Sequence, residues 1–237
     1  MIQADNLHKS FAGRPAVDGL TFSAADGVIT GLIGPNGSGK TTTLRLITGL
    51  LRPHAGQVLV DRINPALDPI GVRRRIGALT DGLGNYPRLT AREHLRYFGK
   101  LRGMSTVELD SRIHLLLDLF DMHQIADRRA QGFSQGERMK LALATAMIND
   151  PPNILLDEPA NGLDVASVRA LRALLERLRA AGKCLLLSSH VMAEVALLCD
   201  AVIVVARGKM VAQGSPEELM RLSNARSLEE AFMELTA

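Results

Sequence analysis

A glycine-rich run that ends in a lysine and a threonine is the most chemically suggestive feature of this sequence. Residues 34–41 read GPNGSGKT and fit the pattern G-x-x-x-x-G-K-[ST], which is typical of a phosphate-binding loop. The apolar residues before it (28–33) predict a buried strand, and residues 42–47 after it have helical spacing. A true phosphate-binding loop requires this strand–loop–helix context, so the pattern predicts a triphosphate site.

The residue types of the loop meet the chemical needs of a triphosphate. Glycines let several backbone N–H groups approach the anion, and the following helix adds its positive N-terminal dipole. Lys40 supplies a mobile charge for the β- and γ-phosphates, and the hydroxyl of Thr41 is a ligand that suits Mg²⁺. The residues expected to hold the nucleotide are Gly34, Pro35, Asn36, Gly37, Ser38, Gly39, Lys40, Thr41 and Thr42.

Two carboxylates follow a second apolar run. Residues 153–158 read NILLDE and predict a buried strand that ends in Asp157 and Glu158. In a parallel sheet the carboxyl ends of the strands face the ligand crevice. Asp157 then suits the Mg²⁺ shell, and Glu158 suits the general base that polarises a water against the γ-phosphate. Solvated acids at a strand end are the alternative.

Four further residues each have a chemical and a structural interpretation. His190 follows the predicted strand 184–188, where it either donates to a γ-phosphate or opens the next helix. Ser134 begins an S-x-x-E capping box, and Gly136 leaves space beside that helix start, which favours either an anion site or an ordinary cap. Phe11, in a predicted turn, either stacks on adenine or packs against a sheet.

The surrounding pattern predicts an α/β fold. Residues 2–7, 20–24 and 56–61 look like strands of a small antiparallel sheet, and 85–150 show only helical patterns. We therefore expect a single domain over 1–237 with a P-loop NTPase core, in which a mostly parallel sheet is flanked by helices. Residues 1–84 and 151–237 are expected to form the ATP-binding core with its β subdomain, and 85–150 an inserted helical subdomain that carries Ser134.

Composition excludes some classes of protein. The net charge of +3 is mild, and 3% aromatic residues argue against a surface that stacks nucleic-acid bases. No apolar run reaches the roughly 18 residues of a membrane span, and the first residues lack the pattern of a signal peptide. Cys184 and Cys199 are expected as small core residues in a reducing compartment, and Arg73–Arg75 as a solvated face.

In this order, the motifs resemble those of the nucleotide-binding subunit of an ABC transporter. The sequence FSQGE at 133–137 stands where the family has its LSGGQ signature, and ILLDEP at 154–159 matches the second nucleotide motif. GLD at 162–164 matches the D-loop, and SSH at 188–190 matches the switch histidine. The resemblance covers essentially the whole chain.

This resemblance implies ATP and Mg²⁺ as cofactors and a head-to-tail dimer with a second copy or a homologous subunit. Each ATP would lie between one subunit's phosphate loop and the other's Ser134 and Gly136. Glu158 would be the catalytic base, His190 the γ-phosphate contact and Phe11 the aromatic residue at adenine. Hydrolysis would drive a transmembrane permease partner from the cytoplasmic, inner face of the cell membrane, with no nucleic-acid partner.

The sequence departs from the family pattern at two places. Asp81 stands where the family usually has Gln, and its added carboxylate is expected to act on Mg²⁺. In the signature, Phe133, Gln135 and Glu137 replace Leu, Gly and Gln, whereas the serine and the second glycine remain. Residues 81–102 and 228–232 are similar to bacterial exporters of the sodium-extrusion and drug-export branch, which favours an exporter.

Three alternatives remain open at this point. A soluble ABC ATPase acting on ribosomes or DNA normally needs two cassettes in one chain or a long coiled coil. A regulatory subunit would bind ATP but hydrolyse it weakly. A small-molecule P-loop kinase leaves residues 134–137 and His190 without a role.

Overall fold

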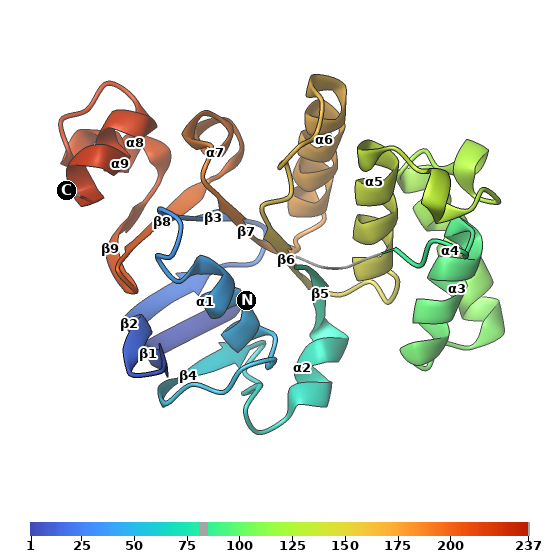
Figure 1. Ribbon diagram of the computed structural model, residues 1–237, viewed down its shortest axis with the longest axis horizontal. Helices are drawn as coiled ribbons and strands as arrows, with labels where there is room; N and C mark the ends of the chain where they lie inside the picture. Colours follow the sequence, from blue (N-terminus) through green and yellow to red (C-terminus); the bar gives the residue numbers. More distant parts are fainter. Residues whose placement is uncertain (81–84, 237) are drawn as a thin grey trace.

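A six-stranded sheet forms the centre of the molecule (Figure 1). The computed structural model describes residues 1–80 and 85–236, so the prediction for Asp81 lies outside the described residues. The strand order is β5-β6-β7-β3-β8-β9, and all neighbours are parallel except the last pair. The strands are β3 (Ile29–Ile33), β5 (Ile76–Leu79), β6 (Asn153–Asp157), β7 (Cys184–Ser189), β8 (Ala201–Ala206) and β9 (Lys209–Gly214). Every residue of β3, β6 and β7 is buried, as their continuous apolar runs predict.

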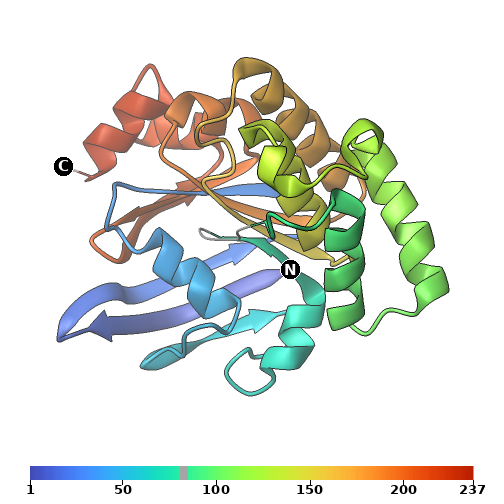
Figure 2. The ribbon, with the colours of Figure 1, turned by 45° about the vertical axis from the view of Figure 1, so that its right-hand side comes forward.

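A second, antiparallel sheet packs beside the first. It contains β1 (Ile2–Phe11), β2 (Arg14–Ala24) and β4 (Ala55–Val60) in the order β2-β1-β4. Its apolar side chains join those of α1 (Lys40–Ile47) and of one face of the central sheet in a single core. Figure 2 shows this small sheet on the side of the central sheet opposite to α6 (Val165–Ala180) and α7 (Met192–Leu198).

All elements described between 85 and 150 are helical, as the sequence pattern predicts. They are α3 (Ala91–Leu101), α4 (Thr106–Leu119) and α5 (Gln135–Ala146), with short 3₁₀ turns at His123–Ile125 and Ala130–Gly132. Their apolar faces share one core with α6 and the central sheet. The remaining helices are α2 (Pro69–Arg75), α8 (Pro216–Leu222) and α9 (Leu228–Thr236). The division into a core and a helical subdomain stays a prediction.

Capping boxes fix the starts of α3 and α5. The hydroxyl of Thr90 accepts a hydrogen bond from the N–H of Glu93 at 3.2 Å, and the Glu93 carboxylate accepts one from the N–H of Thr90 at 2.9 Å. Ser134 and Glu137 form the same reciprocal pair at 2.7 and 3.2 Å. Each box satisfies helix-end donors that would otherwise lack partners, so α5 begins at Gln135 as the sequence predicts.

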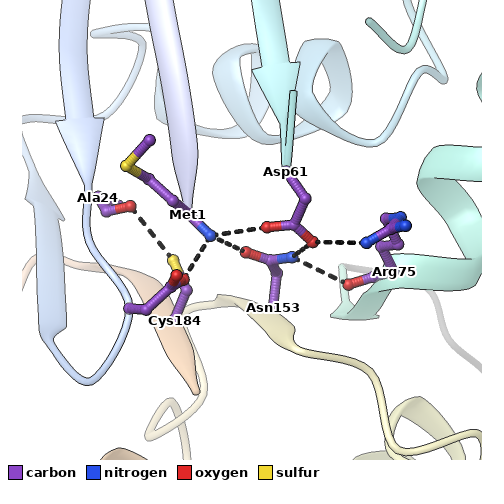
Figure 3. A network of polar contacts seen from close by, with 7 residues as sticks. Met1, Ala24, Asp61, Arg75, Asn153 and Cys184 are labelled. Atoms are coloured by element: carbon purple, nitrogen blue, oxygen red, sulfur yellow. Dashed lines mark hydrogen bonds and ion pairs between the residues drawn. The ribbon is translucent and has the colours of Figure 1, made fainter. Parts of the chain in front are cut away.

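A polar network joins the two sheets at the start of β6 (Figure 3). The buried Asn153 donates through Nδ2 to Asp61 at 2.8 Å and to the carbonyl of Arg75 at 3.2 Å. The amino group of Met1 donates to Asp61 at 2.8 Å and to Asn153 Oδ1 at 3.0 Å. This network anchors β6 at the end opposite to Asp157, so the carboxylate is presented from a fixed strand.

Both cysteines are buried and free, as predicted for small core residues. Burial raises the pKa of the Cys184 thiol to about 11 and that of Cys199 to about 12. The side chains of Arg73, Arg74 and Arg75 are exposed in the last turn of α2, where cations complement the helix dipole. No helix formed by residues 1–80 or 85–236 has the length and apolar character needed to cross a membrane.

Candidate nucleotide site

The predicted strand–loop–helix arrangement is present at residues 29–47. Strand β3 ends at Ile33, and α1 begins at Lys40 after the loop. Gly39 has φ +107°, and a Cβ there would lie 2.3 Å from the carbonyl oxygen of Ala16. A Cβ on Gly34 would lie 2.2 Å from the carbonyl oxygen of Val205. These glycines are therefore required by the packing of the loop itself, in addition to any approach by a phosphate.

Lys40 is folded over the loop. Its Nζ donates to the carbonyl oxygen of Gly34 at 2.6 Å and to that of Pro35 at 3.3 Å. Burial lowers the pKa of Lys40, while the nearby charges of Glu158 and Asp157 act in the opposite direction. The ammonium group is thus partly desolvated beside two carboxylates, and it is held by carbonyls that a phosphate can replace.

Asp157 and Thr41 lie side by side. The hydroxyl of Thr41 donates to Oδ2 of Asp157 at 3.0 Å, and Ser188 donates to its Oδ1 at 2.5 Å. The Asp157 side chain is buried, and β6 and β7 place it directly beside Ser188. A hydroxyl and a carboxylate this close are hard oxygen donors, so this pair fits Mg²⁺, which takes few protein ligands.

Glu158 has an unusual backbone conformation at the end of β6. Its φ is +48°, in the left-handed region that few residues other than glycine adopt. Its N–H donates to the hydroxyl of Ser188 at 2.9 Å, and its Oε2 lies 2.7 Å from Nδ1 of His190. His190 precedes α7 by two positions and is paired with the carboxylate, which favours the chemical interpretation of this histidine.

One hollow of about 360 Å³ brings most of these groups together. It is lined by residues 36–42 together with Glu158, Asn161 and His190. Neither Ser134 nor Gly136 lines it. A Cβ on Gly136 would lie 2.7 Å from Oγ of Ser167, so this glycine fits the chain's own packing.

Phe11 is not packed into the core. Its side chain is 47% exposed, and the ammonium of Lys9 lies 5.7 Å from the ring centroid. The hairpin of β1 and β2 that carries this ring contacts the phosphate loop, through Ala16 against Gly39. The ring is therefore available for stacking, and its contact with adenine stays a prediction.

Sequence reasoning missed Ser188, which joins Asp157 and the backbone of Glu158. It also missed the contact in which Gln135 Nε2 donates to the carbonyl of Asn161 at 3.1 Å. A signal for Ser188 existed, since a polar residue in the buried strand 184–188 needs a hydrogen-bond partner on a neighbouring strand. No local pattern signals the contact of Gln135.

Comparison with known proteins identifies the family. The sequence profile described as ABC transporter matches residues 17–161, which is more than half of the chain. The chain belongs to the ABC transporter family. It is an ATP-binding, ATP-hydrolysing subunit of that family, as predicted, and the alternatives outside transport are not favoured.

Relatives of this ABC subunit match along most of their length. The chain is 41% identical to the ABC transporter ATP-binding protein NatA of Bacillus subtilis (strain 168), over 92% of this chain and 89% of that one. It is 37% identical to the Nod factor export ATP-binding protein I of Paraburkholderia xenovorans (strain LB400), over 92% of this chain and 72% of that one.

Solved structures of ABC subunits confirm the predicted fold class. The structure of an ATP-binding subunit of an ABC transporter matches with a TM-score of 0.91 and 30% identity over the whole of both chains. A dimeric bacterial ABC transporter cassette matches with a TM-score of 0.81 and 26% identity, over 91% of this chain and 98% of that one.

Proposed function

We propose that this chain is the ATPase subunit of an exporter and works as a head-to-tail dimer at the inner face of the cell membrane. The observation that carries the proposal is the hollow in which the phosphate loop, Glu158 and His190 meet. Ser134 and Gly136 lie outside it, which is the arrangement required if they serve the nucleotide of a second subunit. The relative described as a dimeric cassette supports this assembly.

In this proposal the residues of the hollow divide the work of hydrolysis. Residues 34–42 hold the phosphates, and Lys40 exchanges its bonds to the loop carbonyls for bonds to phosphate oxygens. Thr41 and Asp157 would hold Mg²⁺, which neutralises charge on the phosphates when it is bound. Asp81 is proposed as an additional carboxylate near the metal.

Glu158 is proposed as the general base. It accepts a proton from water as the water oxygen bonds to the γ-phosphorus and the bond to the β-phosphate oxygen breaks, which gives ADP and phosphate. His190, at 2.7 Å from Glu158, is placed to donate to an oxygen of the γ-phosphate. Phe11 is proposed to stack on adenine from the hairpin that contacts the loop.

The exporter assignment rests on similarity. One relative is named for the export of Nod factor, and residues 81–102 and 228–232 resemble the exporter branch. The partner is a transmembrane permease. The chain is proposed to divide into a core (1–84 and 151–237) and a helical subdomain (85–150), and the helical subdomain would face the permease and the second subunit.

Affinity purification of the tagged chain from gently solubilised membranes of its native cell tests the proposal. We expect a protein with several membrane spans to co-purify, and the complex to hydrolyse ATP only with Mg²⁺. Recovery from the soluble fraction alone, together with ribosomes or nucleic acid, would contradict the transport assignment.

A further inference from the structure

Gln135, the first residue of α5, turns its side chain toward the segment that follows Glu158. Its Nε2 donates to the carbonyl oxygen of Asn161 at 3.1 Å. The N–H of Asn161 donates in turn to the carbonyl oxygen of Glu158 at 3.1 Å. Two hydrogen bonds and one short turn therefore connect the start of α5 to the backbone of the proposed base.

The turn after Glu158 is shaped around this side chain. Gly162 has φ +70°, and a Cβ there would lie 2.3 Å from Nε2 of Gln135. Gly136 packs closely against the first turn of α6 at Ser167. Glycines at both positions thus bring the helix start and the turn into contact without any nucleotide.

A cavity borders this contact between α5 and the end of β6. Its volume is about 650 Å³, and it is lined by Gln135, Arg138, Glu158 and Asn161 among others. Within residues 1–80 and 85–236, the bond from Gln135 is the one hydrogen bond between α5 and the turn 158–163. This hydrogen bond therefore gives a movement of the helix start a direct polar route to Glu158, beside the apolar packing of Met139 and Leu163 against the shared core.

We propose that Gln135 is a positioning residue that couples the start of α5 to the general base Glu158. The inference rests on the proposed function, in which Ser134 and Gly136 contact the ATP on the partner's phosphate loop. Binding of that ATP fixes the helix start, and Gln135 then fixes the carbonyl of Asn161 and the backbone of Glu158. One subunit's nucleotide thereby sets the geometry of the base in the other site.

Glutamate at position 135 tests this coupling because it keeps the shape of glutamine but cannot donate to a carbonyl oxygen. Gln131→Glu is the matched control, since Gln131 lines the same cavity and its side chain has no hydrogen bond among the described residues. We expect the kcat of Gln135→Glu to be about fivefold below that of the control, as for a lost positioning hydrogen bond. Gln135→Met, which is uncharged, should show the same loss.

A second measurement separates positioning from dimer formation. In a Glu158→Gln background, which is expected to block hydrolysis, ATP-driven dimerisation followed by light scattering should be equal for Gln135→Glu and Gln131→Glu. Equal kcat values for these two variants, or wild-type kcat in Gln135→Met, would overturn the inference. A parallel loss of dimerisation and kcat would also overturn it, because Gln135 would then act at the interface. Failure of the Glu158→Gln chain, with Gln135 intact, to dimerise with ATP would instead contradict the proposed function.

Discussion

Lys40 is the residue proposed to offer its charge to the phosphates, and its surroundings suit the approach of an anion. The ammonium is buried and is held by two carbonyl oxygens of its own loop. A neutral carbonyl is a weaker partner for an ammonium group than a phosphate oxygen is. Nucleotide binding therefore replaces moderate hydrogen bonds by charge-assisted ones at a position that is already desolvated.

Substituting Lys40 by Ala should weaken ATP binding by about tenfold to a hundredfold, because bonds between charged groups are lost. Titration with a fluorescent ATP analogue measures this loss. Lys100→Ala, at an exposed lysine in α3, is the control and should bind like the wild type. Unchanged affinity in Lys40→Ala would contradict the assignment of the phosphate loop.

Ser188 is a second residue on which the site depends. Its hydroxyl donates to Asp157 at 2.5 Å and accepts from the N–H of Glu158 at 2.9 Å, so one side chain orients both acids. Ser188→Ala should reduce kcat by about tenfold and raise the Mg²⁺ concentration needed for half-maximal activity, with little change in ATP affinity. Steady-state kinetics over a Mg²⁺ titration measure both effects. If Ser188 were only structural, Ser188→Ala would lower the unfolding temperature. The protein that stayed folded would then need the same Mg²⁺ concentration for half-maximal activity as the wild type.

At the scale of elements, local sequence patterns were sufficient for the buried strands, the capped helices and the phosphate loop. Strand burial follows from continuous apolar runs, and the starts of α3 and α5 follow from their capping boxes. The contacts that join elements were not predictable in this way. Ser188 meets Asp157 across 31 positions of sequence, and Gln135 meets Asn161 across 26, so only the tertiary fold brings them together.

His94 is a further example, because its sequence position gave no reason to assign it a role. Its side chain is buried between α3 and α5, with Nδ1 at 3.2 Å from the hydroxyl of Thr145. That hydroxyl donates to the carbonyl of Leu141 at 2.7 Å, so the proton of the neutral imidazole lies on Nδ1. Nε2 is buried without a partner among the described residues. Burial lowers the pKa of His94 to about 4.

This environment predicts a pH-dependent stability of the packing between α3 and α5. Between pH 6.5 and about 4 the unfolded chain binds a proton at His94 that the folded chain does not bind. The free energy of unfolding should therefore fall as the pH falls through this range, by up to about 3 kcal/mol from this group. Denaturant unfolding followed by circular dichroism at several pH values measures the slope.

In the His94→Phe variant the free energy of unfolding should lose this part of its pH dependence, because phenylalanine cannot take up a proton. Phenylalanine also suits the site, because the ring centroid of Phe98 lies 4.8 Å from that of His94. His114→Phe, at an exposed histidine of α4, is the matched control and should keep the wild-type slope. If the free energy of unfolding depended on pH equally in the two variants, His94 would not be the source of that dependence.

At the scale of the whole molecule, the fold separates two groups of residues that are proposed to act on the same nucleotide chemistry. The hollow around Lys40 is lined by Glu158 and His190, whereas Ser134 and Gly136 lie at the start of α5, outside that hollow. In the proposed function a single chain therefore offers two half-sites. Two chains in head-to-tail arrangement join each half-site to its complement, and ATP then lies inside the interface.

This arrangement makes dimerisation depend on ATP and on the failure to hydrolyse it. Glu158→Gln removes the proposed general base but keeps the shape of the side chain, so hydrolysis should fall by about a hundredfold or more while ATP remains bound. The variant should move from monomer to dimer on addition of ATP, and ADP should have no such effect because it lacks the γ-phosphate that Ser134 and Gly136 are proposed to contact. Light scattering coupled to gel filtration measures the change in mass.

A double variant, Glu158→Gln with Lys40→Ala, links the two half-sites in one experiment. It keeps Ser134 and Gly136 intact but should bind ATP about tenfold to a hundredfold more weakly, so it should remain a monomer at the lowest nucleotide concentrations that dimerise Glu158→Gln alone. Glu176→Gln, at an exposed position of α6, is the control for the loss of a carboxylate and should hydrolyse ATP like the wild type. A dimer that forms equally with ATP, with ADP and without nucleotide would show that the interface does not contain the γ-phosphate, and would require a different role for the start of α5.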